Sequence, residues 1–178
     1  MQPIWKKSKK EIKDEDYENF YMHEFYDYAK PLKTIHYKVE GNTSYTALLF
    51  IPSQRPFNYY TSDYKLGLKL YSRGVFIKDE AKEIVSDYFR FIRGVVDSDD
   101  LSLNISREIL QQDYQMNALK KSVDKKIKST LENMLEKDRE NYEKFFNAFG
   151  ADVVKIHCFY PPFLCTNTVD AMFFHDCF

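Results

Sequence analysis

Glycine is scarce in this sequence, which has five glycines in 178 residues. Neither of the two common glycine-rich nucleotide motifs, Gly-x-x-x-x-Gly-Lys and Gly-x-Gly-x-x-Gly, is present. The serine elbow Gly-x-Ser-x-Gly and the zinc-protease pair His-Glu-x-x-His are absent as well. The sequence therefore excludes the familiar phosphate-binding loops and these two hydrolase signatures.

The chain also has almost no net charge, because 26 basic and 27 acidic residues leave a formal charge of -1 at pH 7. Such a chain has no overall field to attract DNA, RNA or an anionic membrane. No apolar run reaches the roughly 18 residues that a membrane span needs, and residues 1–13 lack the apolar core of a secretory signal. We therefore expect a cytoplasmic protein with no nucleic-acid or membrane partner.

Cysteine is absent from the first 150 residues. Three cysteines and two histidines lie beyond that point, at Cys158, Cys165, Cys177, His157 and His175. An odd number of clustered cysteines is a poor disulfide framework. Structural zinc sites usually contain short Cys-x-x-Cys steps, which are missing here. We therefore predict no metal site.

Charge density changes abruptly at Gly150, since only four charged residues lie in 151–178. This change marks a boundary between a charged body and an apolar, cysteine-containing tail. We interpret residues 151–178 as non-native sequence, either from a truncated or frame-disrupted reading frame or from a vector. An exposed tail of this composition would favour association.

Hydrophobic periodicity predicts a mixed unit followed by helices. A helix over 13–24 precedes an alternating strand over 34–40 and a second strand over 45–51, joined by a turn at 41–42. The second strand is apolar on both faces, which indicates a central position in the sheet. The remaining predictions are a strand over 68–77 interrupted at Gly74, a short acidic helix over 79–88, a strand over 89–96, a long amphipathic helix over 116–134 and a helix over 139–149 that ends at Gly150. The pattern favours a layered α/β or α+β fold.

The long loop between Pro52 and Gly67 is rich in aromatic residues: Phe57, Tyr59, Tyr60 and Tyr64. These rings either fold back onto the sheet or form an exposed patch that meets a partner. The sequence leaves both possibilities open.

The segment 97–112 reads DSDDLSLNISREILQQ. Asn104 or Ser106 can cap a helix whose first turn contains Arg107, and Gln111 follows four residues later on the same face. An arginine fork beside an amide suits recognition of phosphate oxygens. An ion pair between Arg107 and a nearby carboxylate explains the pattern equally well.

Four runs carry a resemblance to a known family: PIWKKSKKEI, ALLFIPSQRPF, LKLYSRGVFIKDEA and GVVDSDDLSLNISREILQQ. Over residues 3–150 the chain resembles the middle domain of the heat-shock protein ninety chaperones, in the bacterial HtpG branch. The resemblance implies a ribosomal protein S5 domain 2-like α-β-α layered unit over 1–112, which includes a catalytic loop at 97–112. A small helical coil then occupies 113–150, and residues 151–178 do not match.

In that family, ATP and Mg are held mainly by a separate N-terminal domain, and a C-terminal domain closes a homodimer. The resemblance implies that Arg107 in the SRE motif reaches the γ-phosphate, with Asn104 and Gln111 supporting the loop. The fragment alone is then not expected to hydrolyse ATP. The aromatic loop is similar to the family's amphipathic loop, which makes Phe57, Tyr59 and Tyr60 candidates for contact with unfolded client proteins.

Two other functions remain open at this point. The transducer domains of type II topoisomerases and mismatch-repair ATPases share this general fold and sense phosphate, although they usually do so with a lysine. A pure protein-interaction scaffold would leave Arg107 without a catalytic role.

Overall fold

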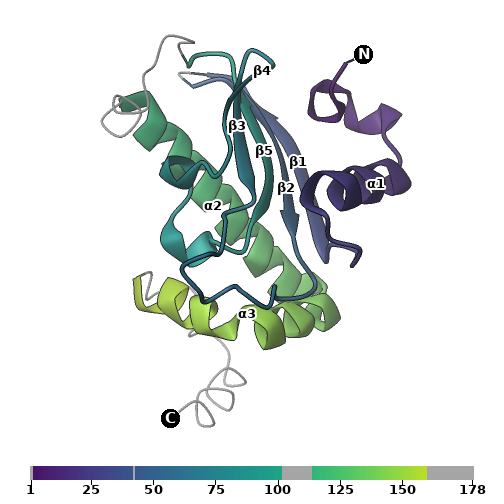
Figure 1. Cartoon of the computed structure of the whole chain (residues 1–178), viewed down its shortest axis with the longest axis vertical. Helices are drawn as coiled ribbons and strands as arrows, with labels where there is room; N and C mark the ends of the chain where they lie inside the picture. Colours follow the sequence, from purple (N-terminus) through teal and green to yellow (C-terminus); the bar gives the residue numbers. More distant parts are fainter. Residues whose placement is uncertain (1, 42, 102–113, 160–178) are drawn as a thin grey trace.

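The computed structural model of the chain describes residues 2–41, 43–101 and 114–159. In these ranges a five-stranded sheet with the order β1-β2-β5-β3-β4 lies between helical layers (Figure 1). The strands are β1 (Lys33–Val39), β2 (Tyr45–Ile51), β3 (Leu68–Ser72), β4 (Val75–Lys78) and β5 (Arg93–Ser98). The α-helices are α1 (Asp14–Phe25), α2 (Tyr114–Lys137) and α3 (Arg139–Phe159).

The sheet is mixed. Strand β2 pairs antiparallel with β1 and β5, β3 pairs antiparallel with β4, and the single parallel pairing among the described strands joins β3 to β5. Six of the seven β2 residues are buried, because helices cover both faces of the sheet. The predicted central position of this strand is therefore confirmed.

Each face of the sheet has its own core. Helix α1 and residues 2–13, which we call the N-terminal segment, cover one face of the sheet. There Trp5, Tyr17 and Tyr21 pack against Leu48 and Phe50. Helices α2 and α3 cover the other face (Figure 1). The buried side chains of α2 recur every three or four residues, at Met116, Leu119, Val123, Ile127, Leu131 and Met134. The predicted α-β-α layering is thus observed.

Four predicted elements differ from the structure. The strand predicted over 89–96 begins only at Arg93, as β5, because residues 87–89 form a 3₁₀ turn. The interrupted strand over 68–77 is a hairpin, because Arg73 and Gly74 both have positive φ (52° and 80°) and form a tight turn. The acidic helix over 79–88 is instead two 3₁₀ turns, Lys82–Ile84 and Asp87–Phe89. Between these turns, the backbone N–H and hydroxyl of Ser86 donate to the Asp124 carboxylate of α2 at 3.1 and 2.5 Å. This tertiary contact replaces the hydrogen bonds of a continuous helix.

The last difference lies beyond Gly150: the predicted helix end coincides with a kink, and a second helical stretch follows it. The backbone of α3 departs from helical geometry at Phe149 (φ -128°, ψ 19°) and the helix then continues to Phe159. Phe149 packs against the rings of Tyr59, Phe91 and Phe145. The predicted break is therefore observed as a kink at Phe149, whose ring is held in the core, and the chain resumes helical geometry after it.

Candidate functional site

The predicted phosphate-contacting residues Asn104, Arg107 and Gln111 lie outside the described residues. The structure does describe residues 97–101, which we call the loop stem and which precede this segment in the chain. It also describes the first turn of α2, which follows the segment. Strand β5 runs into the stem and α2 begins at the same end of the sheet as the β3–β4 turn (Figure 1). The segment that carries Arg107 therefore begins and ends on the folded body.

Asp97 anchors the start of the loop stem. Its side chain is buried, and one carboxylate oxygen accepts the indole N–H of Trp5 at 3.0 Å and contacts the Lys6 ammonium at 3.1 Å. The other oxygen accepts the backbone N–H of Gly74 at 3.0 Å. A buried carboxylate is stable only when donors of this kind replace water. Asp97 thus ties the stem to the N-terminal segment and to the β3–β4 turn.

The rest of the loop stem is held by two turns of the sheet. The Ser72 hydroxyl donates to the carbonyl of Leu101 at 2.6 Å, and Arg73 Nε donates to the carbonyl of Asp99 at 3.0 Å. From the β1–β2 turn, the backbone N–H of Ser44 donates to the carboxylate of Asp100. Because these bonds come from different parts of the fold, the stem is a rigid base for the segment that carries Arg107.

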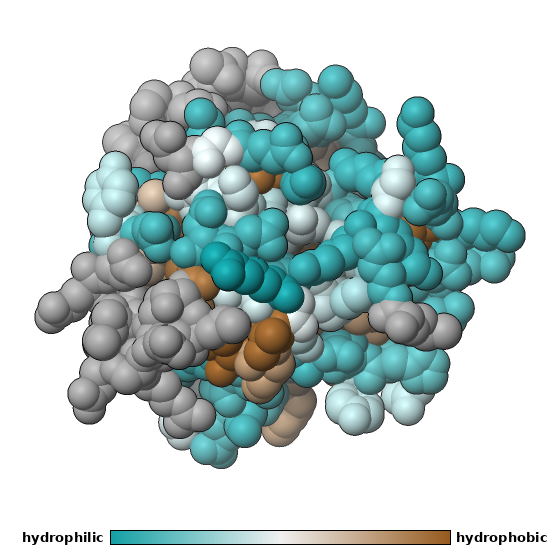
Figure 2. Space-filling model, turned by 90° about the horizontal axis from the view of Figure 1, so that it is seen from above, coloured by the Kyte–Doolittle hydropathy of each residue, from teal (hydrophilic) through white to brown (hydrophobic). Residues whose placement is uncertain are grey.

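Two large apolar side chains are exposed beside this base. Val75 and Phe76, at the start of β4, are 51% and 52% exposed. Figure 2 looks onto this end of the molecule and shows a small apolar patch among hydrophilic side chains. Apolar side chains that are half exposed here can be covered by another protein domain.

The aromatic loop divides into a buried and an exposed part. Tyr59 is fully buried, and its hydroxyl donates to the buried Asp152 carboxylate at 2.5 Å. Burial and this contact raise the pKa of Tyr59, so the phenol stays neutral as a donor. Phe57 is fully exposed and Tyr60 is 52% exposed, with the Arg55 guanidinium over the Tyr60 ring. Both sequence alternatives therefore apply to the loop, and Tyr59 is a core residue in this conformation.

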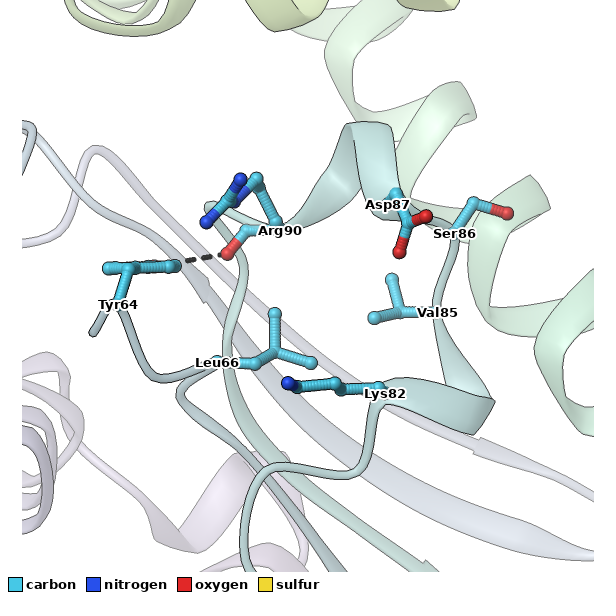
Figure 3. Close-up of a pocket in the computed structure, with 7 residues that line it drawn as sticks. All are labelled: Tyr64, Leu66, Lys82, Val85, Ser86, Asp87 and Arg90. Atoms are coloured by element: carbon cyan, nitrogen blue, oxygen red, sulfur yellow. Dashed lines mark hydrogen bonds between the residues drawn. The ribbon is translucent and has the colours of Figure 1, made fainter. Parts of the chain in front are cut away.

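A pocket of about 290 Å³ lies beside the aromatic loop (Figure 3). Leu66 and Val85 contribute apolar surface to it, whereas Lys82 and Asp87 contribute opposite charges. The Tyr64 hydroxyl closes one side by donating to the carbonyl of Arg90 at 3.0 Å. Among the described residues no group of three or more metal-ligating side chains occurs, here or elsewhere.

His36 has a structural role. Its Nε2–H donates to the carbonyl of Trp5 at 3.0 Å, so Nδ1 accepts the Tyr17 hydroxyl at 2.7 Å. Burial lowers the pKa of His36 from its ordinary value of 6.5, and Lys9 adds to the effect. The ring therefore joins the N-terminal segment to β1 in its neutral form.

The lowered pKa of His36 predicts a loss of stability in mild acid. The unfolded chain takes up a proton near pH 6.5, whereas the folded chain does so only at lower pH, so the free energy of unfolding falls as pH decreases through this window. We expect a loss on the order of 1 kcal/mol between pH 7.5 and 5.5. Urea unfolding of the wild type and of His36→Gln, which retains a donor and an acceptor, measures it. Equal losses in both proteins would contradict the assignment.

Comparison with known proteins gives consistent matches. The model of the Hsp90 protein family matches residues 1–159. The chaperone protein HtpG of Oceanobacillus iheyensis is 54% identical over 153 residues, which are 86% of this chain and 24% of that protein. For HtpG of Clostridium acetobutylicum the identity is 55% over 150 residues, or 84% of this chain and 24% of that protein.

A solved structure matches as well. The middle domain of a Plasmodium falciparum heat shock protein superposes with a TM-score of 0.75 at 30% identity, covering 88% of this chain and 60% of that one. The chain thus spans about a quarter of the length of the HtpG proteins that it matches.

The family match ends at residue 159, beyond Gly150, and the division of the chain at Gly150 stays a prediction. Within the described ranges, no helix is both long and apolar enough to cross a membrane.

Proposed function

Because this chain belongs to the Hsp90 family, we propose that it acts as the middle segment of an ATP-dependent chaperone and supplies Arg107 to ATP held by another domain. The family match decides against the transducer of a topoisomerase or mismatch-repair enzyme. ATP and Mg²⁺ would be bound mainly by an N-terminal domain, and a C-terminal domain would form the homodimer. Cytoplasmic location follows from the same proposal.

The anchored loop stem is the observation that supports this role. Arginine stabilises phosphoryl transfer only if its guanidinium is delivered to the charge that grows in the transition state. A long side chain at the end of an unsupported loop would lose much of that benefit to conformational entropy. Here the stem is held by the buried Asp97 and by two turns of the sheet. Asn104 and Gln111 would then order the segment around Arg107.

The exposed pair Val75 and Phe76 gives the N-terminal domain a place to dock. Both residues pair with Ser72 and Tyr71 of β3, which in turn pair with Ser98 and Asp97 of the loop stem. Apolar area removed from water there is worth about 25 cal/mol per Å². Docking on this patch would bring the bound nucleotide to the end of the sheet where the loop stem lies.

A chimera tests whether the segment completes an ATPase. Residues 1–150 would replace the matching part of the Oceanobacillus iheyensis protein. We expect the chimera to hydrolyse ATP and the isolated chain not to hydrolyse it, because the chain has no glycine-rich nucleotide loop. A chimera that is folded by circular dichroism but inactive would contradict the proposal.

The aromatic loop supplies the proposed client surface, through Phe57 and Tyr60. We expect Phe57→Ser combined with Tyr60→Ser to weaken binding of reduced, carboxymethylated α-lactalbumin by about tenfold, since contact with two exposed aromatic rings is lost. Fluorescence anisotropy of the labelled client measures this.

A matched control tests whether the effect is local to the loop. Tyr26 and Tyr28 are 84% and 85% exposed and lie just beyond α1. Their double replacement by serine removes a similar exposed aromatic surface elsewhere on the molecule. Equal weakening by both pairs would show that clients do not prefer the loop.

A further inference from the structure

A second and larger pocket, which we call the basic pocket, lies where the N-terminal segment meets the sheet. Its volume is about 440 Å³, within the range of small-molecule sites. Three of its lysines, Lys6, Lys7 and Lys9, come from the N-terminal segment, and Lys38 comes from β1. The pocket therefore collects positive charge from two parts of the chain that the fold brings together.

The acidic residues of the basic pocket do not cancel this charge. Asp97 is already bonded to Trp5 and Lys6, which leaves Asp99 as the other carboxylate in the lining. Lys38 pairs with Glu40 at 2.7 Å. Lys7 and Lys9 make no ion pair with any residue that the structure describes. The neutral His36 adds no charge of its own.

We propose that the basic pocket binds a small anion with two or more phosphate groups, held chiefly by Lys7 and Lys9. An ammonium group is a compact charge with three donors and can donate to phosphate oxygens from many directions. A ligand with several negative charges can engage both lysines at once and outweigh repulsion from Asp99, whereas a single carboxylate cannot.

Binding of an anion in the basic pocket would weaken one of the contacts that anchor the loop stem. Lys6 lines the pocket and also contacts Asp97. An anion that shares the Lys6 ammonium weakens its hold on Asp97, which anchors the stem. The binding step itself does not depend on the role proposed for Arg107.

The fluorescence of Trp5 can report binding in the basic pocket. Trp5 is the only tryptophan of the chain, it lines the pocket, and its indole N–H donates to Asp97. We expect pyrophosphate, added to the full chain at constant ionic strength, to change the fluorescence of Trp5 with saturation. Isothermal titration calorimetry under the same conditions checks binding independently of the probe.

Paired variants decide whether the two lysines form the site. Lys7→Gln combined with Lys9→Gln should weaken pyrophosphate binding about tenfold or more, because two charge contacts are lost. Lys10→Gln combined with Lys13→Gln removes the same charge from the same segment outside the lining and should change affinity by less than about twofold. Equal losses in the two pairs, binding of orthophosphate as tight as that of pyrophosphate, or neither heat nor fluorescence change would each overturn the proposal.

Discussion

Turnover of ATP is expected to fall at least about tenfold when Arg107 is replaced by alanine in the active chimera, since arginines delivered from a second module contribute roughly 10³ to 10⁵ in related phosphoryl transfers. The loss should lie in kcat, because the guanidinium acts on charge that grows in the transition state. Nucleotide affinity should change little, since another domain holds ATP. Steady-state hydrolysis and a nucleotide titration separate the two quantities.

Two further variants make the Arg107 result specific. Arg107→Lys keeps the charge but loses the bidentate fork, so it should recover only part of the rate. Arg139→Ala removes an exposed arginine that pairs with Glu143 on α3 at 3.2 Å and should leave turnover unchanged. Wild-type turnover in Arg107→Ala would favour the interaction scaffold.

The free energy of unfolding should drop by about 3 to 5 kcal/mol when Gly94 is replaced by alanine, which combines overpacking with backbone strain. Gly94 lies in β5 opposite Leu49 of β2. An added Cβ would lie 2.3 Å from the Leu48 carbonyl oxygen and 2.8 Å from the Leu49 Cα. These are backbone atoms, so no side-chain rotation relieves the clash. The positive φ of 154° adds to the cost.

Urea unfolding and thermal denaturation measure the Gly94→Ala effect, and the midpoint temperature should fall on the order of 10 °C. Gly150→Ala is the matched control, because its Cβ would meet only the Phe146 ring at 3.7 Å or more, an ordinary contact. Its effect should stay within about 1 kcal/mol. If Gly94→Ala were as mild as this control, β2 and β5 would not be held as closely as the structure shows.

The hydrophobic periodicity of the sequence predicted most of the secondary-structure elements, because long periodic segments depend on few distant contacts. The amphipathic repeat of α2 and the two-sided apolar run of β2 needed only the period of each element. The start of α1 is also local: the Asp16 carboxylate accepts the backbone N–H of Lys13 at 2.9 Å, at a helix N-terminus rich in acidic residues. The family resemblance rested on four runs of matching residues rather than on periodicity, and the comparisons confirmed the family.

The errors arose where distant contacts override local preference. Ser86 bonds to Asp124 of α2, which breaks the expected acidic helix into two turns. Asp152 receives the Tyr59 hydroxyl in a segment that charge density had separated from the body. No local rule distinguishes the buried Tyr59 from the exposed Tyr60 beside it. Their different roles depend on which ring reaches the core.

By itself, the sequence determined the layered fold, the family and the candidate arginine, since periodicity and motif spacing are properties of short stretches of chain. Only the tertiary structure decided how the loop stem is anchored. Trp5 and Asp97 are 92 positions apart, and their bond exists because the fold packs Trp5 and Lys6 beside Asp97 of β5. Burial and pairing between such distant residues depend on the whole packed arrangement, so no short window of sequence contains them.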